Sequence, residues 1–223
     1  MYKVVLFDLD GTLTDSREGI CKSVQYALVK MGRPAPELAD LECFIGPPLK
    51  TSFREFYNIT GEEADRAVTF YRERYSDVGK YENVPYEGIA EMLCALKEAG
   101  YILAVASSKP ELFVEDILKH FGLYDYFHYV AGSDMEGKRG EKEDVIEEVF
   151  RRMKLDEENR KKYAVMVGDR HFDINGAKYF GLDSIGVTYG FCNDGELEEA
   201  GATYVVDTVA QLQELLLSKK ADV

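Results

Sequence analysis

The chain has 223 residues and carries 41 Asp and Glu against 27 Lys and Arg, so its net charge is −14 at pH 7. A surface this acidic repels nucleic acid and anionic membranes, and we expect neither as a partner. With 46% hydrophobic residues, the length is enough for one large domain or for a domain with a sizeable insertion.

The four cysteines indicate the compartment. Cys21, Cys43, Cys94 and Cys192 are scattered, and no two of them form a CxxC pair. We interpret them as reduced thiols, which favours a cytoplasmic location. We find neither a signal-peptide pattern nor an apolar run long enough to span a bilayer, which agrees with that expectation.

Short apolar runs alternate with helical patterns along most of the chain. We predict strands at 4–7, 102–106, 129–131, 164–167, 184–187 and 204–206, and helices at 110–121, 142–153, 172–180 and 208–217. The strand runs are almost continuously apolar, which is typical of strands buried on both faces. The alternation predicts an α/β fold, a Rossmann-like, doubly wound parallel sheet with helices on both sides.

One long segment, 16–83, has helical patterns and no convincing strand. Ser16 has the position of a cap for a helix that Gly32 ends, and Thr60 with Glu63 has the spacing of a capping box. The stretches "GRPAPELAD" and "FIGPPLK" are turn-rich breaks. We therefore predict an all-helical cap domain at 16–83, inserted into a core made of 1–15 and 84–223.

Two acids follow the first predicted strand. Asp8 and Asp10 are two residues apart, so both side chains can face one site if the chain stays extended. They lie at a carboxyl end of the sheet, where doubly wound folds bind ligands. The alternative is that Asp8 only caps the turn before Gly11. A calcium loop is excluded, because a strand precedes the acids and the glycine is not at the sixth position.

A second acidic pair follows the strand predicted at 164–167. Asp169 comes directly after this strand and Asp173 lies four residues further on. Carboxylates that meet at one point repel each other unless a hard cation holds them, and oxygen ligands favour Mg²⁺. Asp173 has an alternative role as the N-cap of the next helix, and it can perform both.

Small hydroxyls and cations supply candidate phosphate ligands. Ser107 and Ser108 end the strand predicted at 102–106, although Ser108 is equally suited to cap the following helix. Lys142 starts a predicted helix, and on local grounds Lys138, Arg139 and Lys142 are all candidates.

Together these motifs resemble the haloacid dehalogenase-like hydrolase superfamily, in its phosphatase branch with a helical cap. "LFDLDGTLTDS" is similar to the family's nucleophile motif, "LAVASSKP" to the second, Lys142 to the third and "VMVGDRHFD" to the acidic fourth. The resemblance covers essentially the whole chain. "FIGPPLKTSFREFY" and "GSDMEGKRGEKEDVI" resemble the phosphoglycolate phosphatase-like and bacterial 5′-nucleotidase-like members.

The resemblance implies roles for these residues. Asp8 would be the nucleophile that forms an aspartyl-phosphate, and the Asp10 side chain would be the general acid and base. Mg²⁺ would be held by Asp8, the main-chain carbonyl of Asp10 and Asp169, with Asp173 in support. The phosphoryl group would be bound by Gly11, Ser107, Ser108 and Lys142.

The substrate follows less directly from the sequence. We expect a small-molecule phosphate ester, phosphoglycolate or a 5′-nucleotide first, because a capped site favours small molecules over phosphorylated proteins. Candidates for choosing it are cap residues Arg17, Phe44, Pro47, Lys50 and Arg54, although Phe44 fits the cap core better. His171 is either close to the site entrance or a solvated loop residue. A β-phosphoglucomutase-type phosphotransferase and a phosphate-binding regulator are the alternatives, and whether the protein is a monomer or a homodimer stays open.

Overall fold

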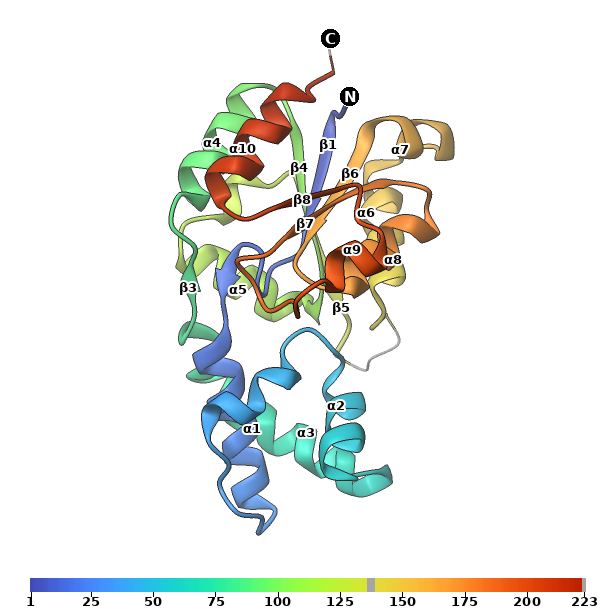
Figure 1. The fold of residues 1–223 in the computed structure, drawn as a ribbon. Coiled ribbons are helices and arrows are strands. Elements are labelled where there is room, and N and C mark those ends of the chain that lie inside the picture. The colour runs from blue at the N-terminus through green and yellow to red at the C-terminus, as the bar shows by residue number, and fades with distance from the viewer. Residues whose placement is uncertain (136–138, 222–223) are drawn as a thin grey trace. The chain divides into compact units, whose positions relative to one another are not determined.

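A six-stranded sheet forms the centre of the larger part of the chain (Figure 1). The computed structural model describes residues 1–135 and 139–221. Its strand order is β5-β4-β1-β6-β7-β8, and each neighbouring pair is parallel. The strands are β1 (Val4–Phe7), β4 (Ile102–Pro110), β5 (Tyr129–Ser133), β6 (Ala164–Gly168), β7 (Asp183–Val187) and β8 (Tyr204–Val206). The predicted strands are therefore confirmed, and β4 runs further than expected.

Helices cover both faces of this sheet. One face packs against α4 (Ile89–Glu98), α5 (Glu111–His120) and α10 (Val209–Ser218), and the other against α6 (Lys142–Met153) and α8 (His171–Tyr179). In β1, Val5 and Phe7 point to the first of these layers while Val4 and Leu6 point to the second, and all four are buried. Burial on both faces explains the continuous apolar runs, and it confirms the Rossmann-like α/β fold. Short elements α7 (Glu157–Tyr163), α9 (Glu196–Ala200) and the 3₁₀ turn η3 (Tyr124–Tyr126) complete this part.

The described chain separates into two compact units, Met1–Thr14 with Pro85–Val223, and Asp15–Val84. The second unit contains α1 (Arg17–Lys30), η1 (Leu38–Phe44), α2 (Leu49–Tyr57), α3 (Gly61–Tyr75) and η2 (Gly79–Tyr81). Its helices enclose an apolar centre in which the rings of Phe44 and Phe53 lie 4.9 Å apart. Two very short strands, β2 (Thr14–Asp15) and β3 (Val84–Pro85), pair where the chain passes between the units.

Two expected caps of this second unit form only in part. Ser16 precedes α1 and Thr60 precedes α3, as predicted, but neither side chain makes a capping hydrogen bond within the described chain. The prediction also omits α2 and α4.

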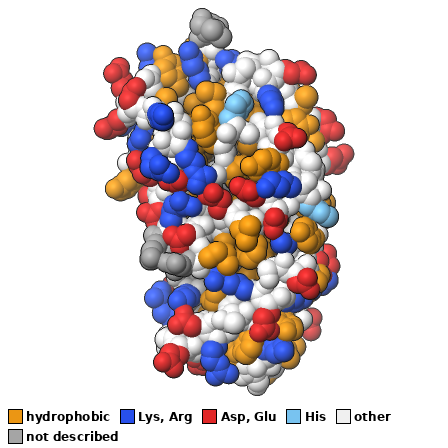
Figure 2. All heavy atoms as spheres, turned by 180° about the vertical axis from the view of Figure 1, so that it is seen from behind, with side chains coloured by type: hydrophobic (Ala, Val, Ile, Leu, Met, Phe, Trp, Pro, Cys, Tyr) orange, Lys and Arg blue, Asp and Glu red, His pale blue; other side chains and the backbone are white. Residues whose placement is uncertain are grey.

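On the face drawn in Figure 2, acidic and basic side chains are interspersed. None of the helices in the described part of the chain is both long and apolar enough to span a membrane.

Candidate active site

The candidate site lies at the carboxyl ends of three adjacent strands. β1 is flanked by β4 and β6, and this is where the order of the strands reverses. Asp8 and Asp10 follow β1, Asp169 follows β6, and Ser107 lies near the end of β4. The Asp8 N–H donates to the carbonyl of Val167 at 2.9 Å, which keeps the ends of β1 and β6 in register. The topology thus brings together residues that are far apart in the sequence.

Three buried carboxylates meet at this point. Asp8, Asp169 and Asp173 each offer an oxygen within 4.8 Å of the others. Burial raises the pKa of Asp169 well above its ordinary value, and the charges of Asp173 and Asp8 raise it further. Burial likewise raises the pKa of Asp173 to about 6, although Lys142 opposes that change. Crowded, desolvated carboxylate oxygens fit a hard divalent cation, whose positive charge would oppose both upward pKa shifts.

Lys142 is the cation that the structure places in this cluster. Its ammonium nitrogen lies 2.7 Å from Asp8 Oδ1 and 2.7 Å from Asp173 Oδ1, and it donates to the carbonyl of Ala106 at 3.1 Å. Burial alone would lower the pKa of Lys142, but the charges of Asp173 and Asp8 outweigh it and raise that pKa above its ordinary value. The side chain therefore stays protonated beside Asp8.

Asp173 has a position different from the N-cap considered above. The N-cap of α8 is Arg170, and Asp173 is the third helical residue, whose carboxylate accepts the Arg170 N–H at 3.1 Å. One oxygen thus closes the helix start while the other pairs with Lys142. Gly168 makes room for this arrangement, since a Cβ there would lie 2.1 Å from Asp173 Cγ.

Asp169 is held by neutral donors. Thr12 Oγ1 donates to its Oδ1 at 3.2 Å, and the Phe191 N–H donates to its Oδ2 at 2.8 Å. Gly11 has φ +83°, and a Cβ there would lie 2.1 Å from Asp169 Oδ2. The Gly11 N–H already donates to the carbonyl of Thr14 at 2.8 Å, so we do not count it among the phosphate donors.

Lys109 is a site residue that sequence reasoning missed. Its ammonium nitrogen donates to Asp10 Oδ1 at 2.7 Å, and its main-chain N–H donates to Ser107 Oγ at 3.4 Å. Ser107 is buried, whereas Ser108 is half-buried. The alternative that Ser108 caps a helix is wrong, because the N-cap of α5 is Pro110. Lys109 stands inside the quoted "SSKP" motif, so the signal was present in the sequence.

Arg139 is engaged elsewhere. It donates to the carbonyl of Gly132 at 2.8 Å and pairs with Glu111 at 3.2 Å. Lys138 lies outside the described residues. Of the three basic candidates, Lys142 is the one that we carry forward.

Comparisons with known proteins decide the family. The family model described as haloacid dehalogenase-like hydrolase matches residues 5–187. The chain belongs to this family. A 5′-nucleotidase of Pseudomonas aeruginosa is 43% identical over 97% of this chain and 96% of its own. The tyrosine-protein kinase PtkA of Mycobacterium tuberculosis is 38% identical over 96% of this chain and 72% of its own. A phosphoglycolate phosphatase of Colwellia psychrerythraea is 28% identical over 98% of this chain and 97% of its own.

A solved structure agrees with this assignment. The crystal structure of a predicted phosphatase from Clostridium acetobutylicum has a TM-score of 0.92 and 46% identity, over 98% of this chain and 99% of that one. The chain is thus a phosphatase of the haloacid dehalogenase-like family, and the expected family and enzyme class are confirmed.

The cap candidates of this haloacid dehalogenase-like phosphatase have local partners inside their own unit. Arg17 pairs with Glu42 at 3.2 Å, Lys50 with Asp65, and Arg54 with Glu55 at 3.4 Å. Phe44 is buried in the apolar centre of that unit, as its alternative role anticipated, and Pro47 is half-buried. Roles for these five residues in substrate choice remain predictions.

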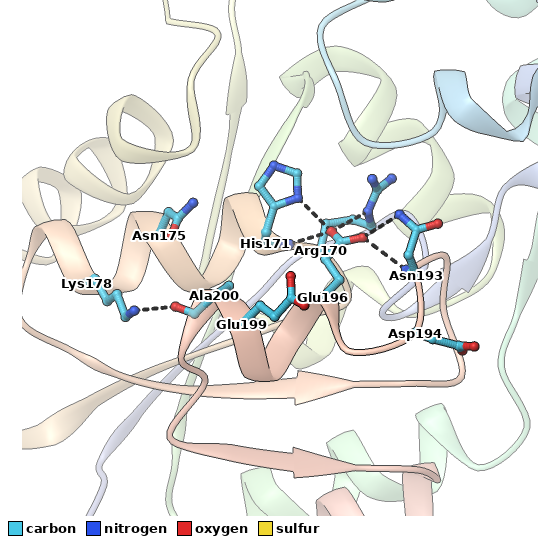
Figure 3. Close-up of a pocket in the computed structure, with 9 residues that line it drawn as sticks. All are labelled: Arg170, His171, Asn175, Lys178, Asn193, Asp194, Glu196, Glu199 and Ala200. Carbon is cyan, nitrogen blue, oxygen red and sulfur yellow. Dashed lines mark hydrogen bonds and ion pairs between the residues drawn. The ribbon is translucent and has the colours of Figure 1, made fainter.

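His171 lines a cavity of about 530 Å³ beside the fourth motif (Figure 3). Its Nδ1 lies 2.7 Å from Glu196 Oε1, and its side chain is 39% exposed. The cavity is bounded by residues of α8, α9 and the segments that precede them. His171 is therefore an oriented residue and not a freely solvated one.

Proposed function

We propose that this phosphatase hydrolyses a small-molecule phosphate monoester, a nucleoside 5′-monophosphate first, through an aspartyl-phosphate on Asp8. The observation that carries the proposal is the group of three buried carboxylates with Lys142 between Asp8 and Asp173. A nucleophilic carboxylate needs a cation to accept a charged phosphoryl group, and this cluster offers both the carboxylate and a binding site for a cation.

The cation that suits this donor set is Mg²⁺. Asp8, Asp169 and the main-chain carbonyl of Asp10 would hold it through oxygen atoms. When bound, Mg²⁺ neutralises charge on the transferring phosphoryl group. Asp173 would act mainly on Lys142, since it is ion-paired to that side chain.

The residues of the chain account for both chemical steps. The free Asp8 oxygen attacks phosphorus, the bond from phosphorus to the ester oxygen breaks, and Asp10 gives its proton to the leaving alcohol. Asp10 then takes a proton from water, the water oxygen attacks phosphorus, and the bond from Asp8 to phosphorus breaks to release phosphate. Lys142 holds the other Asp8 oxygen, and the buried Ser107 hydroxyl is available to a phosphoryl oxygen.

The substrate class is supported by the relatives. The 5′-nucleotidase relative is 43% identical to this chain and the phosphoglycolate phosphatase relative 28%, each over nearly the full length of both chains, and the higher identity favours a nucleoside monophosphate over phosphoglycolate. The relative named as a tyrosine kinase makes phosphoryl transfer to a tyrosine the second candidate. Both candidates would use the same acidic cluster and Lys142.

Phosphate release from a substrate panel tests the proposal. Purified protein is assayed with nucleoside 5′-monophosphates, phosphoglycolate, hexose phosphates, p-nitrophenyl phosphate and a phosphotyrosine peptide, each with Mg²⁺ or EDTA. We expect nucleotides to give the highest kcat/KM, and EDTA to abolish turnover until Mg²⁺ is added. Asp8→Asn is the control for contaminating phosphatase. Turnover indifferent to EDTA contradicts the metal site, and incorporation of labelled phosphate from ATP into tyrosine instead of hydrolysis favours the second candidate.

A further inference from the structure

Glu196, the first residue of α9, contacts residues of two separate segments, Arg170 and His171 on one and Asn193 on the other (Figure 3). Its Oε1 accepts hydrogen bonds from Arg170 Nε at 2.9 Å, from the His171 N–H at 2.9 Å and from His171 Nδ1 at 2.7 Å. Its Oε2 accepts the N–H and the side-chain amide of Asn193, each at 3.0 Å. One carboxylate thus connects the segment 169–171 to the segment 188–195.

Both connected segments determine where Asp169 lies. The first contains Asp169 itself, and the second donates the Phe191 N–H to Asp169 Oδ2 at 2.8 Å. The second segment also packs closely, because a Cβ on Gly190 would lie 2.4 Å from Asp169 Cβ and 2.3 Å from the carbonyl of Gly11. A shift of 188–195 would therefore remove a hydrogen bond from Asp169 or push against it.

The helix α9 alone would not hold the segments 169–171 and 188–195 together. α9 has only five residues, and a helix of this length has little stability of its own. Leu197 anchors it in the core, where it packs against Gly186 so tightly that a Cβ on Gly186 would lie 2.8 Å from Leu197 Cδ1. Leu197 thus holds the helix to the sheet, while Glu196 holds the two segments to each other.

The Glu196 carboxylate is both largely buried and ionised, as a residue that accepts several hydrogen bonds requires. Its side chain is only 9% exposed. Burial would raise the pKa of Glu196, but the N–H groups of Asn193 and His171 and the side chains of Arg170 and His171 outweigh it and lower that pKa to about 2. Glu196 is therefore ionised at every pH at which the enzyme would work.

We propose that Glu196 is a positioning residue that sets the affinity of the acidic cluster for its divalent cation, by fixing Asp169 through the 188–195 segment. This inference rests on the proposed function, since it assumes that Asp169 binds Mg²⁺. Residues that orient metal ligands through hydrogen bonds typically change metal affinity about 10–100-fold when they are removed. Because Glu196 acts through Phe191, we expect an effect at the lower end, about tenfold.

The test compares Glu196→Gln and Glu196→Ala with wild type and with Glu199→Gln. Glu199 is exposed, stands on the same short helix and lines the same cavity, which makes it the matched control. Binding of Mg²⁺ to metal-free protein is measured by calorimetry at a temperature where circular dichroism shows every variant folded. In parallel, the rate on p-nitrophenyl phosphate is followed against Mg²⁺ concentration.

We expect the Kd for Mg²⁺ to rise about tenfold in both Glu196 variants and to stay unchanged in Glu199→Gln. The Mg²⁺ concentration for half-maximal rate should rise by the same factor, while kcat at saturating Mg²⁺ returns to within about twofold of wild type. A purely structural role would instead lower the melting temperature and leave the Kd of the folded protein unchanged, and that result overturns the inference. Wild-type protein that takes up no Mg²⁺ would overturn the proposed metal site itself, which is a distinct outcome.

Discussion

The ammonium nitrogen of Lys109 lies 2.7 Å from Asp10 Oδ1, and the two side chains are 6% and 10% exposed. Asp10 is the acid and base of the proposed mechanism, so its position decides whether a proton can reach the leaving oxygen. Removing one partner of a buried ion pair leaves the other charge uncompensated, which costs about 3–5 kcal/mol. Lys109 therefore determines where the Asp10 carboxylate lies.

We predict that Lys109→Met lowers kcat about 10²-fold on a nucleoside monophosphate, because Asp10 loses its fixed orientation. The loss should be smaller on p-nitrophenyl phosphate, whose leaving group needs little protonation. Lys119→Met, which changes an exposed lysine of α5, is the control. Equal losses on both substrates would show that Lys109 acts on something other than proton transfer.

The two acids of the first motif should be separable by mutation. Asp8→Asn removes the proposed nucleophile, and we expect turnover to fall to background. Asp10→Asn should slow turnover by about 10²–10⁴-fold, the usual contribution of general acid–base catalysis. Rapid acid quench with a phosphorus-32 substrate should detect labelled protein in Asp10→Asn and none in Asp8→Asn. Wild-type rates in Asp8→Asn would contradict the covalent mechanism.

The fold was predictable where burial alone shapes the sequence. Strands buried on both faces must be apolar throughout, and this is why β1 and β6 were found with their ends nearly correct. Helix α4 was omitted although Ile89, Met92 and Leu93 have helical spacing and are buried. Helix α2 was hidden by the Pro-Pro pair of "FIGPPLK", since Pro48 is its N-cap and proline is tolerated at a helix start.

The part of the site that could be predicted consists of the acidic residues that directly follow parallel strands. Acids at the ends of β1 and β6 converge because parallel strands end at one edge of the sheet. The role of Glu196 could not be inferred, because its partners Arg170 and His171 are 26 and 25 residues away and no local pattern encodes that contact. The Phe191 N–H is a main-chain group and leaves no signature in the sequence at all.

A substitution at Gly11 tests whether the close packing of the first motif against Asp169 is needed for activity. Gly11 and Gly32 both have positive φ, +83° and +78°, so alanine strains the backbone at either position. An added Cβ at Gly32 would meet no described atom within 4 Å, whereas at Gly11 it would lie 2.1 Å from Asp169 Oδ2. Gly32→Ala should cost about 1–2 kcal/mol of unfolding free energy and retain full activity.

Gly11→Ala should cost at least as much stability and lower kcat by about 10–100-fold, because Asp169 must move. Chemical denaturation and steady-state rates at saturating Mg²⁺ measure both variants. If Gly11→Ala keeps the activity of Gly32→Ala, the position of Asp169 tolerates displacement.

The cap cations Lys50 and Arg54 provide a test of substrate choice. Both are exposed on the helical unit and pair there with acids, Lys50 with Asp65 and Arg54 with Glu55. If they meet a second anionic group of the substrate, Lys50→Ala and Arg54→Ala should change the ranking of kcat/KM across the substrate panel and leave the Mg²⁺ requirement intact. An unchanged ranking in both variants would make them ordinary surface charges.

Glu148 of α6 should make the free energy of unfolding depend on pH in the acid range. Its carboxylate accepts from Arg151 Nε and from Arg152 Nε, each at 2.7 Å, and its side chain is 11% exposed. The Arg151 hydrogen bond lowers the pKa of Glu148 from 4.5 to about 2, burial opposes this, and Arg152 adds to it.

Because the folded-state pKa of Glu148 lies below the unfolded one, its contribution to stability is complete above about pH 5 and is lost as pH falls toward 2. Glu148→Gln should therefore lower the unfolding free energy at pH 7 by about 1–3 kcal/mol. The difference in unfolding free energy between Glu148→Gln and wild type should narrow steadily below pH 4.5, because there the wild-type carboxylate takes up a proton when the protein unfolds.

Glu147→Gln is the control. Glu147 lies on the same helix, is 52% exposed and pairs with Arg160, and such surface pairs contribute about 1 kcal/mol or less. Urea denaturation of the three proteins between pH 7 and pH 3.5 measures both effects. A difference that stays constant over this range would show that Glu148 stabilises the core by packing and not by its charge.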